Sequence, residues 1–237
     1  MNDCSHNSSL HCAVCRASNA HLLEGQLDNI VAESSLRKKC LDFKKGEPVF
    51  LEGDACEGVY CLKKGVVAIR KYGSDGTSAV MKLIFPGQNF GYRSVLFGKP
   101  HKTSAEALTP VSLCMLSKYD VKAAIDKNPK VRQDLINLIE QDLGAMEEKL
   151  LLTVTKTIRS RFAFLLFTMS KHIDPDANTV TFHLPVSKKD LSNITGITVE
   201  SLSRLLKKFK SLNLIDEKKG LITILDREAL HDMIQED

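Results

Sequence analysis

Short apolar runs separated by glycines fill the chain from about Leu41 to Leu116. The runs, such as PVFL, VVAIRKY and AVMKLIF, are rich in β-branched and aromatic residues and have the length of strands. The triplet Ser74-Asp75-Gly76 is typical of a hairpin turn. Strands of this length with regular turn signals predict a compact antiparallel β-roll.

The pattern changes to a helical period after Ser117. Residues 118–127 have the composition of a short helix, and Pro129 suits the first turn of a longer one. Apolar residues then recur at steps of three or four, which gives the longer helix one apolar stripe. The stripe consists of Leu135, Ile139, Leu143, Met146 and Leu150. It could pack on its own domain, but we favour pairing with the same helix of a second subunit and expect these five residues at a homodimer interface.

Two helices with a tight turn between them are predicted near the C-terminus. Ser187 and Asp190 have the spacing of a capping box, which opens the first helix. Gly196 ends that helix, and Thr198 is an N-cap for a second helix over residues 199–211. Helix, glycine turn and helix make up the helix-turn-helix motif.

Further elements surround this motif and complete the expected fold. Residues 155–172 are typical of a helix, VTFHLPV of an edge strand, and LIDEKKGLITI of two short strands that form a wing. The fold class is therefore α+β, with an N-terminal antiparallel β-roll, a long dimerisation helix and a C-terminal winged helix-turn-helix. The expected domains are a cysteine-containing segment at 1–21, the β-roll sensor domain at 22–128, the dimerisation helix at 129–154 and the DNA-binding domain at 155–237.

The second helix of the motif has one apolar and one polar face. The apolar face, which should pack on the domain, consists of Leu202, Leu205, Leu206 and Phe209. Glu200, Ser203 and Arg204 project from the opposite face near the helix N-terminus. Arg can donate two hydrogen bonds to guanine, Glu can accept one from cytosine, and Ser allows close approach. Glu200 and Arg204 could instead form a solvated ion pair, but two capped helices with flanking lysines favour base reading.

Charge distribution supports a nucleic-acid partner for the C-terminal third. The whole chain has a net charge of only +4. Residues 187–220 carry eight basic and four acidic side chains, so this segment holds a surplus equal to that of the whole chain. We expect contacts with the DNA backbone from Lys188, Lys189, Thr198, Lys207 and Lys208.

Composition and motifs argue against a membrane protein, a secreted protein and an enzyme. The chain has 237 residues, of which 43% are hydrophobic and 26% charged, and no apolar run approaches the ~18 residues of a membrane helix. The N-terminus, MNDCSHNSSL, lacks the features of a secretory signal, so we expect a cytoplasmic protein without a membrane partner. No Ser-His-Asp arrangement, phosphate-binding glycine loop or motif with paired carboxylates is visible, and we do not expect an enzyme.

A β-roll, a long helix and a winged helix-turn-helix in this order resemble the CRP/FNR family of bacterial transcription regulators. The resemblance covers the chain from about Leu22 to its end, and it is most specific in GEPVFLEGD, FPGQNFGYRS and GITVESLSRLLKKF. The E-x-x-S-R arrangement of the FNR-type members falls on Glu200, Ser203 and Arg204. The resemblance implies a homodimer that binds palindromic double-stranded DNA with TTGA-like half-sites and contacts RNA polymerase.

The cyclic-nucleotide-binding members carry residues that this chain lacks. They have Glu just after a Phe-Gly pair, whereas Phe90-Gly91 is followed here by Tyr92 and Arg93. The later segment, HKTSA, lacks the arginine that would pair with a cyclic phosphate, so cAMP is not expected as a ligand. A small molecule or haem in the roll remains an alternative, and its pocket would be lined by Tyr92, Arg93, Lys102 and Thr103.

Seven cysteines, an odd number, argue for reduced thiols. The iron–sulfur members of the family bind a cluster through an N-terminal cysteine group and one distant cysteine in the roll. By resemblance, Cys12 and Cys15 match the N-terminal group and Cys114 the distant position, which implies a [4Fe-4S] cluster and a sensor of oxygen or redox state. The third N-terminal cysteine is missing, so the remaining ligand would be Cys4 or His21.

Other readings of the cysteines stay open. The Cys-x-x-Cys pair could be a thiol switch or a zinc site, or it could hold no cofactor at all. Cys114 lies in an apolar run, where a cysteine is often a small buried hydrophobe. We interpret Cys40, Cys56 and Cys61 as structural.

Overall fold

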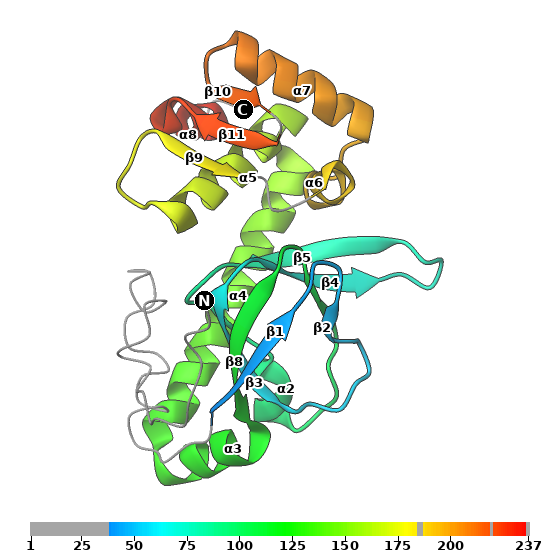
Figure 1. The fold of residues 1–237 in the computed structure, drawn as a ribbon, viewed down its shortest axis with the longest axis vertical. Helices are drawn as coiled ribbons and strands as arrows, with labels where there is room; N and C mark the ends of the chain where they lie inside the picture. Colours follow the sequence, from blue (N-terminus) through cyan, green and yellow to red (C-terminus); the bar gives the residue numbers. More distant parts are fainter. Residues whose placement is uncertain (1–37, 184–186, 219, 236–237) are drawn as a thin grey trace. The chain divides into compact units, whose positions relative to one another are not determined.

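The computed structural model describes residues 38–183, 187–218 and 220–235. The predicted N-terminal metal ligands Cys4, Cys12, Cys15 and His21 lie outside the described residues. The chain divides into two compact units, residues 1–143 and 144–237. Antiparallel sheets form much of the first unit and helices much of the second, and the predicted α+β fold is confirmed (Figure 1).

Two four-stranded antiparallel sheets form the roll (Figure 1). One sheet has the strand order β1-β8-β3-β6 and the other has the order β2-β7-β4-β5. The strands are β1 (Lys38–Phe43), β2 (Pro48–Phe50), β3 (Gly58–Lys64), β4 (Val67–Tyr72), β5 (Ser78–Ile84), β6 (Asn89–Phe90), β7 (Ser104–Ala107) and β8 (Val111–Ser117).

The sheets enclose a core because apolar residues alternate along the strands. The rings of Phe50, Tyr60 and Phe90 lie there with centroids 5.2 to 6.0 Å apart, and Leu62 and Leu113 are fully buried beside them. This interior is therefore filled by aromatic and aliphatic side chains.

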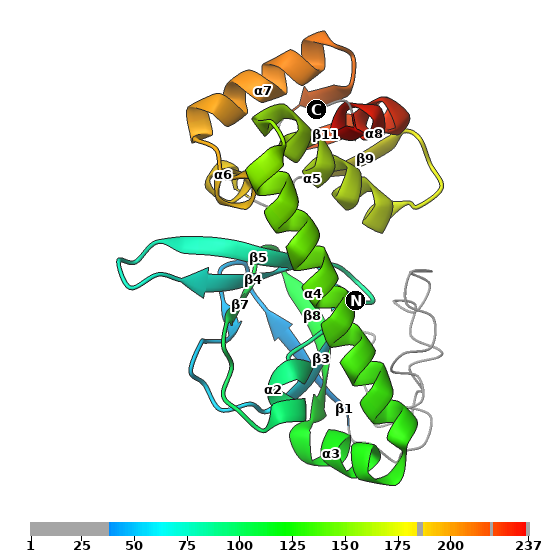
Figure 2. The same ribbon diagram turned by 180° about the vertical axis from the view of Figure 1, so that it is seen from behind.

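Three helices follow the strands of the first unit. They are α2 (Tyr92–Phe97), α3 (Lys118–Lys127) and α4 (Pro129–Thr155). The short helix predicted at residues 118–127 is α3, and the longer helix begins at Pro129 as predicted. Helix α2 was not predicted. Gly91 opens α2 with a φ of 83°, and a Cβ there would lie 2.9 Å from the Tyr60 ring, so this turn requires glycine. Figure 2 shows α2 and α3 beside the first part of α4, where the three helices share an apolar cluster with the outer face of β3 and β8.

The second unit contains the predicted helix-turn-helix and wing. Its elements are α5 (Ile158–Ile173), β9 (Val180–His183), α6 (Lys188–Thr195), α7 (Val199–Ser211), β10 (Ile215–Lys218), β11 (Leu221–Ile224) and α8 (Arg227–Gln235). The strands pair in the order β10-β11-β9, so β9 is an edge strand as predicted. The helix predicted from residue 155 begins instead at Ile158, because Thr157 caps it by accepting a hydrogen bond from the Ser160 N–H. Among the described helices, none has the length and apolarity that a membrane span requires.

Candidate DNA-binding interface and sensor region

Local capping fixes the geometry of α6 and α7. Ser187 and Asp190 form a full capping box, in which each side chain accepts a hydrogen bond from the other residue's backbone N–H. Gly196 ends α6 with a φ of 69°, a left-handed conformation that favours glycine. Thr198 then caps α7 and accepts a hydrogen bond of 3.2 Å from the Ser201 N–H. The predicted start and end of α6 and the predicted start of α7 are therefore fixed by residues within a few positions.

The apolar face of α7 anchors the helix on its own unit. Leu202 and Phe209 are fully buried, Leu206 is nearly so, and the ring of Phe209 lies 5.3 Å from that of Phe162 on α5. This packing fixes the rotation of α7 about its axis. The opposite face is therefore held toward solvent.

The predicted base-reading residues lie on that opposite face. Glu200 and Arg204 are exposed, and Ser203 is half-buried between them. The Ser203 hydroxyl donates a hydrogen bond of 3.0 Å to the Val199 carbonyl. The ion pairs of the described residues do not include Glu200 with Arg204, so both side chains are available to an external partner.

The lysines near α7 fall into two groups. Asp216 on β10 holds Lys210 at 2.7 Å and Lys218 at 2.8 Å, and hydrogen bonds from these lysines lower the pKa of its carboxyl to about 2. In contrast, no ion pair is recorded within the described residues for the exposed side chains of Lys188, Lys189, Lys207 and Lys208. These four uncompensated cations are the ones predicted to contact phosphates.

Two apolar stripes run along α4. Val131, Leu135 and Leu138 are buried in the cluster shared with α2 and α3. The second stripe, which we call the outward stripe, recurs at alternating steps of three and four residues and consists of Ile136, Ile139, Leu143, Met146 and Leu150. Four of these side chains are exposed, whereas Ile139 is half-buried against the same cluster. Leu143 and Leu150 are 58% and 65% exposed. Leu135, predicted at the interface, is committed to the core, and Ile136 takes its place on the outward stripe.

A carboxylate on α4 connects this helix to the roll. The Tyr92 hydroxyl donates a hydrogen bond to Asp142 Oδ2, and Lys82 Nζ on β5 lies 2.5 Å from Asp142 Oδ1. Burial raises the pKa of the Tyr92 phenol, and the neighbouring Asp142 charge raises it further. Tyr92 follows Gly91 at the start of α2, so Asp142 joins α2, β5 and α4.

The residues predicted to line a ligand pocket in the roll differ in their exposure. Tyr92 is buried against Asp142, whereas Arg93 and Lys102 are exposed. His101 is 3% exposed and stacks on Phe50 with ring centroids 3.6 Å apart, and its Nδ1 lies 3.2 Å from the Ser94 hydroxyl. Burial lowers the pKa of His101.

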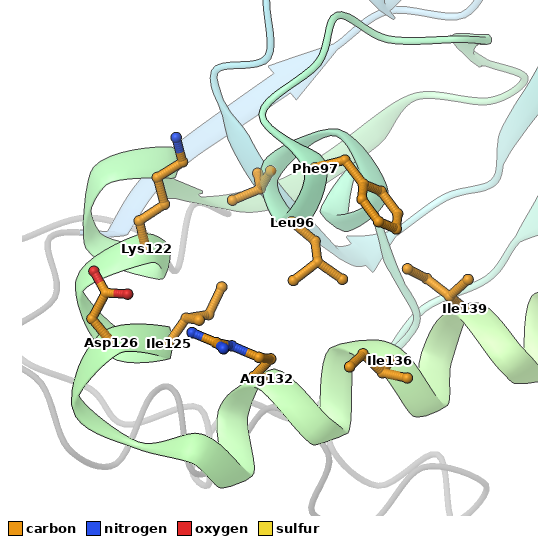
Figure 3. Close-up of a pocket in the computed structure, with 9 residues that line it drawn as sticks. Leu96, Phe97, Lys122, Ile125, Asp126, Arg132, Ile136 and Ile139 are labelled. Atoms are coloured by element: carbon orange, nitrogen blue, oxygen red, sulfur yellow. The ribbon is translucent and has the colours of Figure 1, made fainter.

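A groove of about 580 Å³ opens between α2, α3 and α4 (Figure 3). Leu96 and Phe97 of α2 face Ile136 and Ile139 of α4 across it. None of the four predicted pocket residues lines this groove. Because Ile136 and Ile139 also begin the outward stripe, the groove continues the apolar surface of α4.

Cys114, the predicted metal ligand in the roll, lies in the middle of β8. Its side chain is half-buried on the face opposite Leu113, so it is not part of the interior of the roll. Within the described ranges, no group of three or more His, Cys, Asp or Glu residues is arranged to hold a metal ion. A thiolate on this outer face suits a cluster only if the other ligands come from the N-terminal residues.

Models of known protein families match parts of both units. A model of the cyclic nucleotide-binding domain matches residues 40–128, and a model of the Crp-like helix-turn-helix domain matches residues 160–233. The two matches together span more than half of the chain. The chain belongs to the CRP/FNR family.

Individual CRP/FNR proteins resemble the chain along most of its length. It is 27% identical over 231 residues to the fumarate and nitrate reduction regulatory protein of Yersinia pestis, a match that covers 94% of this chain and 89% of that protein. It is 27% identical over 206 residues to the anaerobic regulatory protein of Haemophilus influenzae, with 86% and 77% covered. The structure of FixK2 from Bradyrhizobium japonicum has a TM-score of 0.76 and 26% identity, over 84% of this chain and 98% of that one.

Membership of the CRP/FNR family assigns the chain to transcription regulators with a DNA-binding helix-turn-helix. Sequence reasoning alone missed two features of this regulator. Asp142 was not identified from the sequence, because its partners Tyr92 and Lys82 are 50 and 60 residues away. Ile136 was missed because helical spacing alone does not indicate whether the row with Leu135 or the neighbouring row with Ile136 faces the core.

Proposed function

We propose that the protein is a homodimeric, sequence-specific transcription regulator that binds palindromic DNA with TTGA-like half-sites. The observation that carries this proposal is the solvent-facing side of α7. There Glu200 and Arg204 are exposed beside uncompensated lysines, while Leu202 and Phe209 fix the rotation of the helix. A capped helix with such a face suits the major groove.

The side chains on this face divide into two roles. Arg204 donates to guanine O6 and N7, Glu200 accepts from cytosine N4, and Ser203 permits close approach. Thr198 and the lysines at positions 188, 189, 207 and 208 contact phosphates, which position the helix without reading sequence.

The outward stripe of α4 supports the proposed dimer. Alternating steps of three and four are the spacing of a helix that pairs with its own copy. The stripe is apolar and largely exposed from Ile136 to Leu150, so a second α4 would cover it. A two-fold dimer would bring two α7 helices to two half-sites of a palindrome.

The sensed signal is proposed to be oxygen or redox state. Two relatives of the chain are named fumarate and nitrate reduction regulatory protein and anaerobic regulatory protein, which supports this signal. Cys114 would hold a [4Fe-4S] cluster together with Cys12, Cys15 and either Cys4 or His21. When bound, such a cluster supplies a centre that oxygen degrades. A change at Cys114 would reach α4 through β8 and the apolar cluster that its neighbour Leu116 shares with that helix.

Cyclic AMP is not proposed as the ligand, since the position after Gly91 is Tyr92, whose hydroxyl is bonded to Asp142. We expect no enzymatic activity. The protein would work in the cytoplasm, where bacterial DNA lies, and would contact RNA polymerase there.

A binding experiment tests the base-reading role. Arg204→Ala should lower affinity for a palindromic TTGA duplex by about 1–3 kcal/mol per half-site and remove discrimination against a duplex whose half-site guanine is replaced. Arg204→Lys is the matched control, because it keeps the charge but not the two-pronged geometry, and it should also lose discrimination. Lys207→Ala should weaken binding to both duplexes equally and reduce the salt slope by about one unit per subunit. Unchanged discrimination in Arg204→Ala would overturn the assignment of α7.

Iron and acid-labile sulfide, measured after anaerobic purification, test the sensor. Cys114→Ser should lose both, whereas Cys56→Ser, which changes a buried thiol, should keep them. A wild-type protein that contains neither iron nor sulfide would overturn the cluster while leaving the DNA-binding proposal intact.

A further inference from the structure

Three cysteines lie side by side across the sheet β1-β8-β3-β6. Cys114 on β8 is directly opposite Cys40 on β1 and directly opposite Cys61 on β3. The same row continues to Asn89 on β6, the partner of Cys61. Cys40 and Cys61, which the sequence suggested to be structural, therefore flank the one cysteine of the roll that was predicted to be functional.

The three side chains lie on one face of the sheet. Residues directly opposite in an antiparallel pair share a face, and successive residues along a strand alternate. The neighbours of Cys114 and Cys61 along their strands, Leu113 and Leu62, are buried inside the roll, so the cysteines are on the outer face. We call Cys40, Cys114 and Cys61 the thiol row.

Antiparallel geometry brings both outer cysteines within bonding range of the central one. The N–H and C=O of a residue in a central strand point to the same neighbouring strand. Cys114 therefore forms a hydrogen-bonded pair with one flanking cysteine, with Cα atoms about 5.5 Å apart, and a non-hydrogen-bonded pair with the other, at about 4.5 Å. Both separations fall within the range of about 4.4–6.8 Å that a disulfide spans. Cys40 and Cys61 lie two strands apart, and the distance between their Cα atoms, roughly 9–10 Å, is too long for a disulfide.

Exposure differs along the thiol row. Cys40 is exposed, whereas Cys61 and Cys114 are half-buried, and none of the three is in a disulfide. The most accessible thiol is therefore the edge member of the row, and oxidants reach exposed thiolates first. The central Cys114 is placed to react with whichever neighbour is oxidised.

We propose that the thiol row is a site of reversible oxidation, at which a peroxide converts Cys40 and Cys114 to a disulfide. The Cys40 thiolate attacks a peroxide oxygen, the O–O bond breaks, and hydroxide or alkoxide leaves, which yields a sulfenic acid at Cys40. The Cys114 thiolate then attacks the Cys40 sulfur, the S–S bond forms and the S–O bond breaks, and hydroxide leaves. Two thiols lose two electrons in total, and the peroxide is reduced to water or to an alcohol and water.

Cys61 gives the row a second arrangement. Its thiolate can attack Cys114 of the disulfide, which moves the S–S bond to Cys61 and releases Cys40 as a thiol. The two disulfides are mutually exclusive because both use the sulfur of Cys114. If Cys114 is a ligand of the proposed cluster, either disulfide also removes it from the ligand set. This consequence rests on the proposed function, whereas the formation of the disulfide does not.

Peptide mapping of the oxidised full-length chain tests the site. The protein is prepared free of iron, treated with hydrogen peroxide, alkylated and digested with trypsin. Cleavage after lysine and arginine leaves Cys40 alone in peptide 40–44 and Cys114 alone in peptide 103–118, while Cys4, Cys12 and Cys15 stay together in peptide 1–16. We expect peptides 40–44 and 103–118 to be cross-linked and the cross-link to disappear with dithiothreitol. The three thiols of the row should fall to one.

Variants separate the members of the row. Cys40→Ser should move the cross-link to Cys61, in peptide 46–63. That peptide also contains Cys56, so the Cys40→Ser/Cys56→Ser double variant should give the same cross-link. Cys114→Ser should abolish both cross-links. Cys56→Ser is the matched control, because Cys56 is buried, its Sγ lies 3.7 Å from the Gly58 carbonyl, and burial raises its pKa; the cross-link should persist in this variant. A wild-type Cys114 that stays alkylated while other thiols oxidise, or that is linked to peptide 1–16, would overturn the proposal. Because iron is absent, neither result depends on the cluster, whose own test is the iron and sulfide content.

Discussion

Replacing Leu143 with alanine should weaken the proposed homodimer without unfolding the chain. Leu143 occupies the middle of the outward stripe of α4 and is 58% exposed, so more than half of its surface is available for burial by a second α4. Fully burying a Leu side chain is worth about 1.5–3 kcal/mol. The part that is exposed in this chain therefore contributes about 1–2 kcal/mol per subunit on pairing.

The symmetry of a dimer doubles this effect. The same replacement occurs on both sides of a two-fold interface, so the expected loss is about 2–4 kcal/mol per dimer. Since each 1.4 kcal/mol is a factor of ten, the dimer Kd should rise about 30-fold to 700-fold. Sedimentation equilibrium over a range of protein concentrations measures this Kd directly.

Two control variants separate pairing from folding. Glu148→Ala changes an exposed residue on α4 outside the stripe and should leave the dimer Kd unchanged. Leu135→Ala changes a fully buried residue of the core and should lower the free energy of unfolding by about 2–5 kcal/mol. A dimer Kd that differs less than twofold between Leu143→Ala and wild type would refute the assignment of this stripe to the interface.

Two further predictions concern the stability of each unit. Phe209→Ala removes a fully buried ring that contacts Phe162, so urea unfolding should show a loss of about 3–5 kcal/mol, and a loss below about 1 kcal/mol would mean that α7 is seated by other contacts. Burial lowers the pKa of His101 in the folded chain, whereas the unfolded imidazole keeps a pKa of about 6.5. Below that pH the unfolded chain binds a proton that the folded chain does not, so stability should fall as the pH decreases, by at most about 1.4 kcal/mol per pH unit. His101→Phe keeps a ring against Phe50 but removes the titrating group, so its stability should depend less on pH. The measurement compares urea midpoints at pH 7.5 and pH 5 for the two proteins. An equal pH dependence in both would show that His101 does not titrate in this way.

The DNA-binding part of the fold could be predicted closely because its determinants are local. Ser187, Gly196 and Thr198 each act on backbone groups within a few residues, so helix ends follow from sequence. The opposite faces of α7 follow from its period in the same way. Sequence therefore placed both the buried face of this helix and the exposed residues Glu200 and Arg204.

Features that depend on pairing between distant segments could not be predicted. Cys40 and Cys114 are 74 residues apart, and nothing local to either states that β1 pairs with β8 in the register that sets them opposite each other. A shift of one residue would move one of them to the other face. The same limit applies to Asp142, whose partners come from α2 and β5. It also applies to the outward stripe of α4, because the direction of this stripe depends on the packing of the neighbouring row against α2 and α3.

The bond between the Ser203 hydroxyl and the Val199 carbonyl affects what α7 can recognise. A hydroxyl has one proton, and in Ser203 that proton is already donated within the helix, at 3.0 Å. Toward a base edge this oxygen then acts only as an acceptor, so it suits the amino groups of adenine or cytosine and disfavours thymine O4 or guanine O6. The internal hydrogen bond of one helical turn thus gives a small side chain a chemical preference that its size alone would not provide.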